Sequence, residues 1–315
     1  MSEMTLVFTQ QIVKMFLMVL IGYGAVKLGL MPATAGKGLS QVSVAIIRPC
    51  AIIAAFQVAF SRERLLGLCL AIFAAALTHV VLIGLIWLMN RGKERFTPIE
   101  QLSMTYSNSG NLLMPLIAAS MGQEWIFYTC AYIAVVQVFV WTHGKSVACR
   151  EPQIDWKKAL GNINILAMVI GLIFFCTSFT IPGPLGLAVD NLGDALGAAS
   201  MLTIGVSFAT LKGLDLKKFS KVLAVTGFRL ILSPLLMLAI FLALRLHTLL
   251  PDAEQILLIT ILGVGAPTAV VVTQLAQLYD QEVDHASLLG VVTMLCSLVT
   301  LPTLIWVYET AVSLF

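Results

Sequence analysis

Residues 106–115 read Tyr-Ser-Asn-Ser-Gly-Asn-Leu-Leu-Met-Pro, a polar stretch inside the otherwise apolar segment 99–121. A second apolar segment, 254–279, contains the comparable stretch Gly263-Val-Gly-Ala-Pro-Thr-Ala269. Each stretch combines glycine, which has no bias toward helix, with proline, which removes a helical hydrogen bond. We therefore expect two helices that break near the middle of their segments.

The composition indicates that most of this chain is solvated by lipid. Of its 315 residues, 59% are hydrophobic and 11% are charged, whereas soluble proteins carry about 25% charged residues. The formal net charge of +3 is too small to indicate a nucleic-acid partner. A protein of this size has no soluble core large enough for so much apolar surface, and we expect the lipid bilayer to surround it.

Ten apolar segments are long enough to cross a bilayer, which takes about 20 residues. They predict an all-α polytopic membrane protein with ten transmembrane helices in one integral membrane domain. The expected spans are 6–30, 38–59, 65–89, 99–121, 125–147, 160–180, 188–211, 219–246, 254–279 and 285–312.

The links between these spans differ in positive charge, which predicts their orientation. The links and termini on the even side hold three basic residues: Arg62, Arg64 and Arg245. The odd-side links hold thirteen: Lys27, Lys37, Arg91, Lys93, Arg95, Lys145, Arg150, Lys157, Lys158, Lys212, Lys217, Lys218 and Lys221. We expect the odd side to be cytoplasmic and both termini to face outward.

The two interrupted segments occupy matching places, each being the fourth span of a five-span half. An odd number of spans per half means that the second half enters the membrane from the opposite side. We predict a first repeat over 1–147, a cytoplasmic link over 148–159 and a second, inverted repeat over 160–315. Interrupted spans at matching positions indicate a transporter's substrate site, although two ordinary proline kinks are the alternative.

Four stretches of the sequence resemble the auxin efflux carrier family, whose bacterial members include carriers of malonate and other small organic acids. They are Leu20-Ile-Gly-Tyr-Gly-Ala-Val-Lys-Leu-Gly-Leu30, Asn108-Ser-Gly-Asn-Leu-Leu-Met-Pro115, Arg229-Leu-Ile-Leu-Ser-Pro234 and Pro267-Thr-Ala269. The resemblance implies a fold like that of the bile acid:sodium symporters, in which spans 4 and 9 cross where they unwind. It also implies a substrate site at the crossing, an elevator-like motion of two domains and a possible homodimer.

Two half-sites are expected around the breaks. Asparagine amides donate hydrogen bonds to a carboxylate without adding a buried charge, and the starts of half-helices attract anions. Alternatively, the asparagines only bond between helices. The first half-site comprises Asn108, Ser109, Gly110, Asn111 and Pro115, and the second Gly265, Ala266, Pro267 and Thr268.

Arg48 lies midway along the second span, directly before Pro49. A buried membrane arginine costs on the order of 3 kcal/mol or more, so it needs a partner. We find no acidic residue in the membrane part of the spans, which leaves an anionic ligand or backbone carbonyls. Arg48 is thus either a substrate contact or a structural anchor, and Gln41 and Gln137 are further candidates for the substrate path.

The remaining polar groups favour structural roles. We interpret Arg229 as structural and His79 as a buried core residue. The turn with Asp280, Glu282, Asp284 and His285 is expected to be solvated rather than metal-binding, and the six cysteines are scattered. The sequence therefore predicts no metal site and no cofactor.

The leading hypothesis is a secondary transporter of small organic anions, such as malonate-like dicarboxylates, in a bacterial inner membrane. The coupling ion, H⁺ or Na⁺, stays open, since carbonyls of the unwound segments could hold sodium. A channel or a ligand-binding sensor on the same fold is the alternative. An enzyme is disfavoured because the sequence contains neither an HExxH nor a GxSxG motif.

Overall fold

The structure is a computed structural model that describes residues 3–32, 34–92, 94–151, 154, 157, 160–209 and 219–314. Within these ranges the regular elements are helices, and the single β contact is an isolated antiparallel bridge between Ser107 and Thr268. The expectation of an all-α protein is confirmed.

Seven helical segments in the described ranges are long and apolar enough to cross a membrane. They are α1 (Glu3–Lys27), α2 with α3 (Ala35–Phe56), α4 (Arg62–Asn90), α7 with α8 (Gln123–Cys149), α11 with α12 (Gly183–Ala209), α13 with α14 (Phe219–Ala243) and α17 (Val283–Val312). The individual bounds are α2 Ala35–Val42, α3 Arg48–Phe56, α7 Ile126–Phe139, α8 Lys145–Cys149, α11 Gly183–Asp194, α12 Leu196–Ala209, α13 Phe219–Gly227 and α14 Ser233–Ala243.

The other apolar segments form shorter helices. The segment expected at 160–180 is the single helix α10 (Ile163–Thr177). The segment expected at 99–121 is divided into α5 (Pro98–Thr105) and α6 (Met114–Ser120), and that at 254–279 into α15 (Ala253–Gly265) and α16 (Val270–Leu278). Both segments with polar interruptions are thus broken, as expected.

Three π-helical turns each end two residues before a proline. Ser43–Ile47 precedes Pro49, Ser109–Leu113 precedes Pro115, and Phe228–Leu232 precedes Pro234. Proline has no N–H and clashes with the carbonyl one turn earlier, and a wider turn relieves that clash. The helices therefore continue through these prolines instead of ending at them.

The helices form two packing groups. The first, here called the panel group, contains α1, α2, α3, α10, α11 and α12; α1 packs along α12, and α3 against α10 and α11. Glycines allow the backbones of α1 and α12 to touch: a Cβ atom on Gly205 would lie 2.1 Å from the carbonyl oxygen of Val19. A Cβ atom on Gly22 would lie 2.6 Å from that of Leu202. Small residues permit this close approach between membrane helices.

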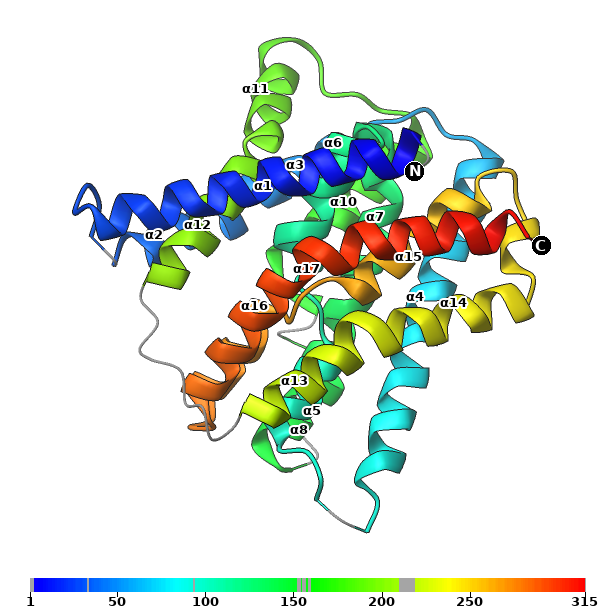
Figure 1. Ribbon diagram of the computed structural model, residues 1–315. Helices are drawn as coiled ribbons and strands as arrows, with labels where there is room; N and C mark the ends of the chain where they lie inside the picture. Colours follow the sequence, from blue (N-terminus) through cyan, green and yellow to red (C-terminus); the bar gives the residue numbers. More distant parts are fainter. Residues whose placement is uncertain are drawn as a thin grey trace.

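The second group, here called the crossover group, contains α4–α8 and α13–α17. In it, α4 packs against α7 and α15, and α17 against α13, α15 and α16. The groups meet where α1 contacts α17 and α6, and where α12 contacts the Ser109–Leu113 turn. Thr5 Oγ1 donates to Glu309 Oε2 at 2.5 Å, so the start of α1 lies beside the end of α17, and both termini lie on one side (Figure 1).

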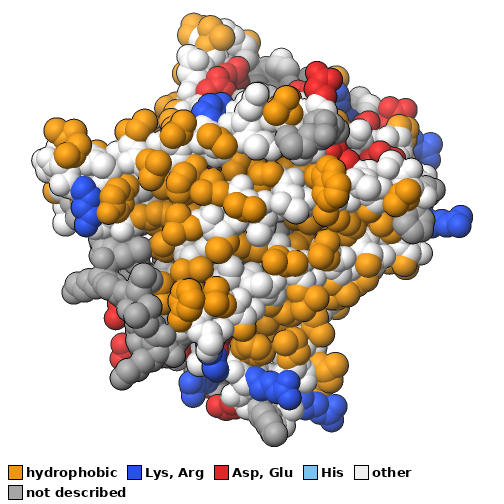
Figure 2. All heavy atoms as spheres, in the orientation of Figure 1, with side chains coloured by type: hydrophobic (Ala, Val, Ile, Leu, Met, Phe, Trp, Pro, Cys, Tyr) orange, Lys and Arg blue, Asp and Glu red, His pale blue; other side chains and the backbone are white. Residues whose placement is uncertain are grey.

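The outer surface is apolar over its middle. Figure 2 shows hydrophobic side chains across the face formed by α1 and α17, with most charged side chains around the rim. Leu17 and Ile21 of α1 and Val299 and Trp306 of α17 are each at least half exposed. Such a band suits contact with lipid chains, which agrees with an integral multi-pass membrane protein.

Candidate functional site

The two breaks meet backbone to backbone. The Asn108 N–H donates to the carbonyl oxygen of Pro267 at 2.8 Å, and the Ala269 N–H donates to that of Tyr106 at 3.0 Å. The paired residues Ser107 and Thr268 are almost fully buried. Unsatisfied backbone groups are costly in a membrane, so each break supplies hydrogen-bond partners for the other.

Arg229 binds the ends of the half-helices that enter the crossing. Its guanidinium donates to the carbonyl oxygens of Ala266 (3.0 Å), Met104 (3.1 Å) and Thr105 (3.1 Å), and makes a longer contact with that of Gly263 (3.4 Å). These carbonyls belong to the carboxyl ends of α5 and α15, where the helix dipoles are negative. The fully buried arginine thus holds both half-helices, which is a structural role.

The half-helices that leave the crossing begin beside a cavity of about 750 Å³. One begins with the turn at Ser109 and continues into α6, and the other begins at Val270. Helix starts present free N–H groups and positive dipole ends. The cavity is lined by Gly36, Lys37, Ser40, Gln41, Asn108, Asn111, Thr203, Ile204, Ser207, Phe208, Pro267, Thr268, Ala269, Val270, Thr273, Gln274, Gln277, Asp284, Ser287, Gly290, Val291 and Met294.

Uncharged polar side chains dominate the polar part of this lining. Among the described residues that line the cavity, Lys37 and Asp284 carry charge, and their charges are opposite. Asn108 and Asn111 line the cavity and are bonded to each other, with Asn111 Nδ2 donating to Asn108 Oδ1 at 3.0 Å. The asparagine pair therefore places amide groups beside the two helix starts.

Five of the expected site residues line this cavity. They are Gln41, Asn108, Asn111, Pro267 and Thr268. The cavity thus brings together residues from three expected spans, two of which are the interrupted ones.

The remaining expected residues are not among those that line the cavity. Ala266 accepts a hydrogen bond from Arg229, Gly265 is the last residue of α15, and Gln137 is a partly buried residue of α7. Ser109 is buried, and Gly110 lies under the guanidinium of Arg48. Arg48 itself lies behind Asn111, to whose Oδ1 its Nη2 donates a hydrogen bond.

The first break lies at the start of the polar stretch 106–115. Its extended residues are Tyr106 and its neighbours, and a helical turn resumes at Ser109, ahead of Pro115. Pro115 is inside the second half-helix, because the preceding π-helical turn removes the clash that would otherwise end the helix. In the second break Pro267 does lie in the extended segment.

Several polar residues of the cavity were not assigned to the site from the sequence. Among them, Thr273, Gln274 and Gln277 belong to α16, and Thr203 and Ser207 to α12. Gln277 follows Thr273 and Gln274 by four and three residues, and Ser207 follows Thr203 by four, so each set shares a helix face. That spacing was the available signal, because a polar face on an otherwise apolar membrane helix needs a partner or a cavity.

A buried acidic residue corrects one expectation. Glu100 of α5 is 2% exposed and contacts His285 through Oε1, 3.2 Å from Nε2, while Lys221 Nζ lies 3.6 Å from its Oε2. Glu100 is the second residue of the segment 99–121, and its partner His285 is buried rather than solvated. The Thr97–Glu100 capping box orients this carboxylate at the start of α5. Among the described residues, no group of His, Cys, Asp and Glu side chains has the arrangement to hold a metal ion.

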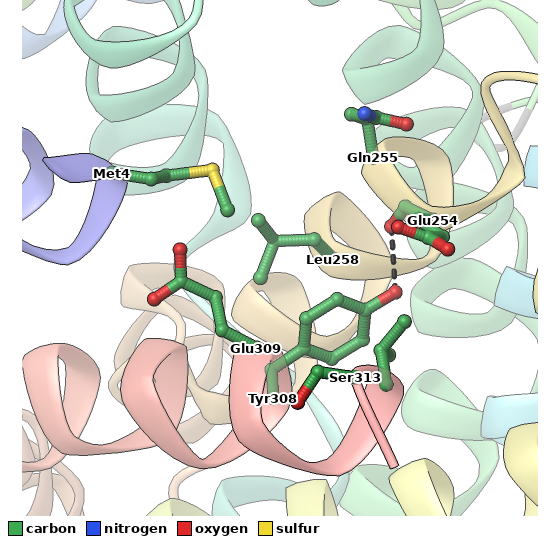
Figure 3. Close-up of a pocket in the computed structure, with 8 residues that line it drawn as sticks. Met4, Glu254, Gln255, Leu258, Tyr308, Glu309 and Ser313 are labelled. Atoms are coloured by element: carbon green, nitrogen blue, oxygen red, sulfur yellow. Dashed lines mark hydrogen bonds between the residues drawn. The ribbon is translucent and has the colours of Figure 1, made fainter. Parts of the chain in front are cut away.

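A smaller cavity of about 280 Å³ lies near the termini, away from the crossing (Figure 3). Glu309 of α17 and Met4 of α1 lie on one side of it, and Tyr308 donates to the carbonyl oxygen of Glu254 at 2.6 Å. Its lining consists of Met4, Glu254, Gln255, Leu258, Tyr308, Glu309, Val312 and Ser313, none of which belongs to the crossing.

The sequence profile of one known family matches residues 7–148 and 149–305, which is nearly the whole chain. The chain belongs to the membrane transport protein family. This is the family of the auxin efflux carriers, so the resemblance read from the four stretches is confirmed. Membership of the membrane transport protein family makes the chain a membrane transporter. A comparison with curated proteins found no match.

Proposed function

We propose that the protein is a secondary transporter of small organic anions, with malonate-like dicarboxylates or related carboxylates as substrates. The observation that carries this proposal is the cavity at the crossing, where two helix starts and the Asn108–Asn111 pair lie together. Helix starts and amide N–H groups bind carboxylates without the desolvation cost of a second buried charge. The cavity is large enough for a small dicarboxylate.

The proposed topology has ten spans in two inverted five-helix repeats, 1–147 and 160–315, joined by 148–159. It counts α5 with α6 as one interrupted span and α15 with α16 as another. The common side of the two termini supports an even number of spans. Together with the loop charges, this topology puts both termini outside the cytoplasm of a bacterial inner membrane.

The two packing groups support the proposal of an elevator-type mechanism. The crossover group contains both breaks and Arg229, whereas the panel group contributes Gln41 and residues of α12 to the cavity. Movement of one group past the other would carry the crossing between the two sides of the membrane. Lys37 and Asp284 come from links that the charge count assigns to the cytoplasm, so the cavity corresponds to the inward-facing state. A homodimer is part of the same proposal.

Uptake of labelled malonate into proteoliposomes tests this function. We expect saturable uptake and accelerated exchange when the vesicles are loaded with unlabelled malonate. Binding without flux would favour a sensor, and flux that neither saturates nor exchanges would favour a channel. Two glutamines of the same interrupted segment give a matched pair: Gln274→Ala alters the crossing cavity, whereas Gln255→Ala alters the smaller one. We expect only the former to change uptake.

A further inference from the structure

Arg48 and the asparagine pair come from different helix groups. Arg48 begins α3 of the panel group, while Asn108 and Asn111 belong to the crossover group. Arg48 is 6% exposed and is not among the described residues that line the cavity. If the cavity binds an anion, as the proposed function states, Arg48 acts on that anion indirectly. It does so through Asn111, which bonds Arg48 and lines the cavity.

A guanidinium has only hydrogen-bond donors, and this fixes how the neighbouring amide is oriented. Arg48 Nη2 donates to Asn111, so the amide oxygen of Asn111 must face Arg48. The Asn111 amide nitrogen then faces Asn108 and donates to Asn108 Oδ1 at 3.0 Å. With its oxygen engaged, Asn108 retains its NH₂ group as the hydrogen-bonding edge that is left for other partners.

This series of bonds gives the amide pair a direction. An isolated asparagine can turn its amide over and offer either an oxygen or an NH₂ group. Here both oxygens are engaged within the Arg48–Asn111–Asn108 series, and the N–H groups remain for the cavity. A carboxylate accepts hydrogen bonds and matches such a surface. The NH₂ group of a neutral amide is itself a donor and would face the N–H donors of the asparagines.

We propose that Arg48 is a positioning residue, which orients Asn111 and Asn108 so that the crossing presents amide donors, and which thereby makes the site select a carboxylate over a neutral amide of the same shape. Arg48 would thus contribute to specificity without contacting the substrate.

The position of the Arg48 guanidinium also requires that residue 110 has no side chain. A Cβ atom on Gly110 would lie 3.0 Å from both Cζ and Nη1 of Arg48. The guanidinium therefore rests on the bare backbone at this position. The buried Nε atom of Arg48 has no hydrogen-bond partner among the described residues, so it does not hold the side chain in place. Gly110→Ala would displace the guanidinium without removing its charge.

The test compares the binding of malonate and of malonamide by the purified full-length protein, using calorimetry. Wild type is expected to prefer malonate. In Arg48→Gln the new side chain can donate or accept, so the preference should fall by about tenfold or more, since one charge-assisted hydrogen bond is lost. Arg48→Lys keeps a donor-only group and should retain most of the preference. Gly110→Ala should behave like Arg48→Gln.

Two controls separate positioning from direct contact. Gln41→Ala removes another lining residue and should weaken both ligands by the same factor. If Arg48 acts through Asn111, adding Arg48→Gln to Asn111→Leu should cause no further loss of preference. A further loss in the double variant would show direct contact and overturn the proposal.

The remaining outcomes are also decisive. An unchanged malonate-to-malonamide ratio in Arg48→Gln, or in Gly110→Ala if the former does not fold, would overturn the positioning role. Size-exclusion chromatography establishes which variants fold. The proposed function fails separately, when folded wild type neither binds nor takes up malonate or another small carboxylate.

Discussion

The guanidinium of Arg229 donates to the carbonyl oxygen of Ala266 at 3.0 Å, and so brings a fixed positive charge to the second break. The same group also binds the carbonyls that end α5. Arg229 is therefore the one described side chain for which hydrogen bonds to the ends of both incoming half-helices are observed.

Replacing Arg229 with methionine should strongly destabilise the protein. The change keeps an unbranched side chain but leaves the carbonyls of Ala266, Met104 and Thr105 without this donor, and each buried unsatisfied group costs about 1–3 kcal/mol. We expect a thermal midpoint in detergent lower by several degrees. Arg64→Met is the control, since Arg64 bonds one carbonyl at an exposed position and should change the midpoint little. Equal shifts in the two variants would contradict this account.

Substrate binding should not depend on sodium at the crossing. The Arg229 guanidinium binds the carbonyl oxygen of Ala266 in the second break and, more weakly, that of Gly263 before it, so a sodium ion beside these carbonyls would meet a like charge. We expect the same malonate affinity in sodium chloride and in choline chloride at equal ionic strength. Loss of affinity in choline would require a sodium site elsewhere in the chain.

Gly205→Ala should separate α1 from α12. The added Cβ would lie 2.1 Å from the Val19 carbonyl oxygen, and overpacking of this kind costs about 1–3 kcal/mol. Thermal unfolding should show the loss. Gly24→Ala, on α1, is the matched control because nothing lies within 4 Å of its added Cβ. A destabilised Gly24→Ala protein would mean that helix substitution alone causes the effect.

Glu100→Ala should destabilise the start of α5. It removes the capping interaction and leaves His285 without its acidic partner in a buried position, for a cost of about 3 kcal/mol. The exposed Glu94→Ala serves as the control. Hydrogen exchange of residues 98–105 measures the effect directly, and unchanged exchange there would contradict it.

The sequence predicts the breaks and part of the cavity lining because both depend on local residue types. Polar and glycine residues inside an apolar run mark where helix gives way, and five expected residues do line the cavity. The sequence does not show how far Pro115 lies from the first break, because a π-helical turn accommodates this proline inside a helix. That accommodation depends on neighbouring helices.

Contacts between distant segments could not be predicted in this way. The pairing of Ser107 with Thr268 and of Glu100 with His285 joins residues that are far apart in the chain. Neither pair has a spacing or a motif that identifies its partner. The position of Arg48 behind Asn111 likewise depends on how the panel group packs against the crossover group.

Because the two breaks pair through backbone atoms, the side chains around them can vary in sequence without loss of the pairing. The hydrogen bonds between Asn108 and Pro267 and between Ala269 and Tyr106 use no side-chain atoms, so their geometry survives most substitutions. Side chains that face the cavity, such as Thr273 and Gln274, can then change without rebuilding the frame. If the cavity binds substrate as proposed, single replacements at 273 and 274 should alter the substrate range while leaving the paired breaks intact.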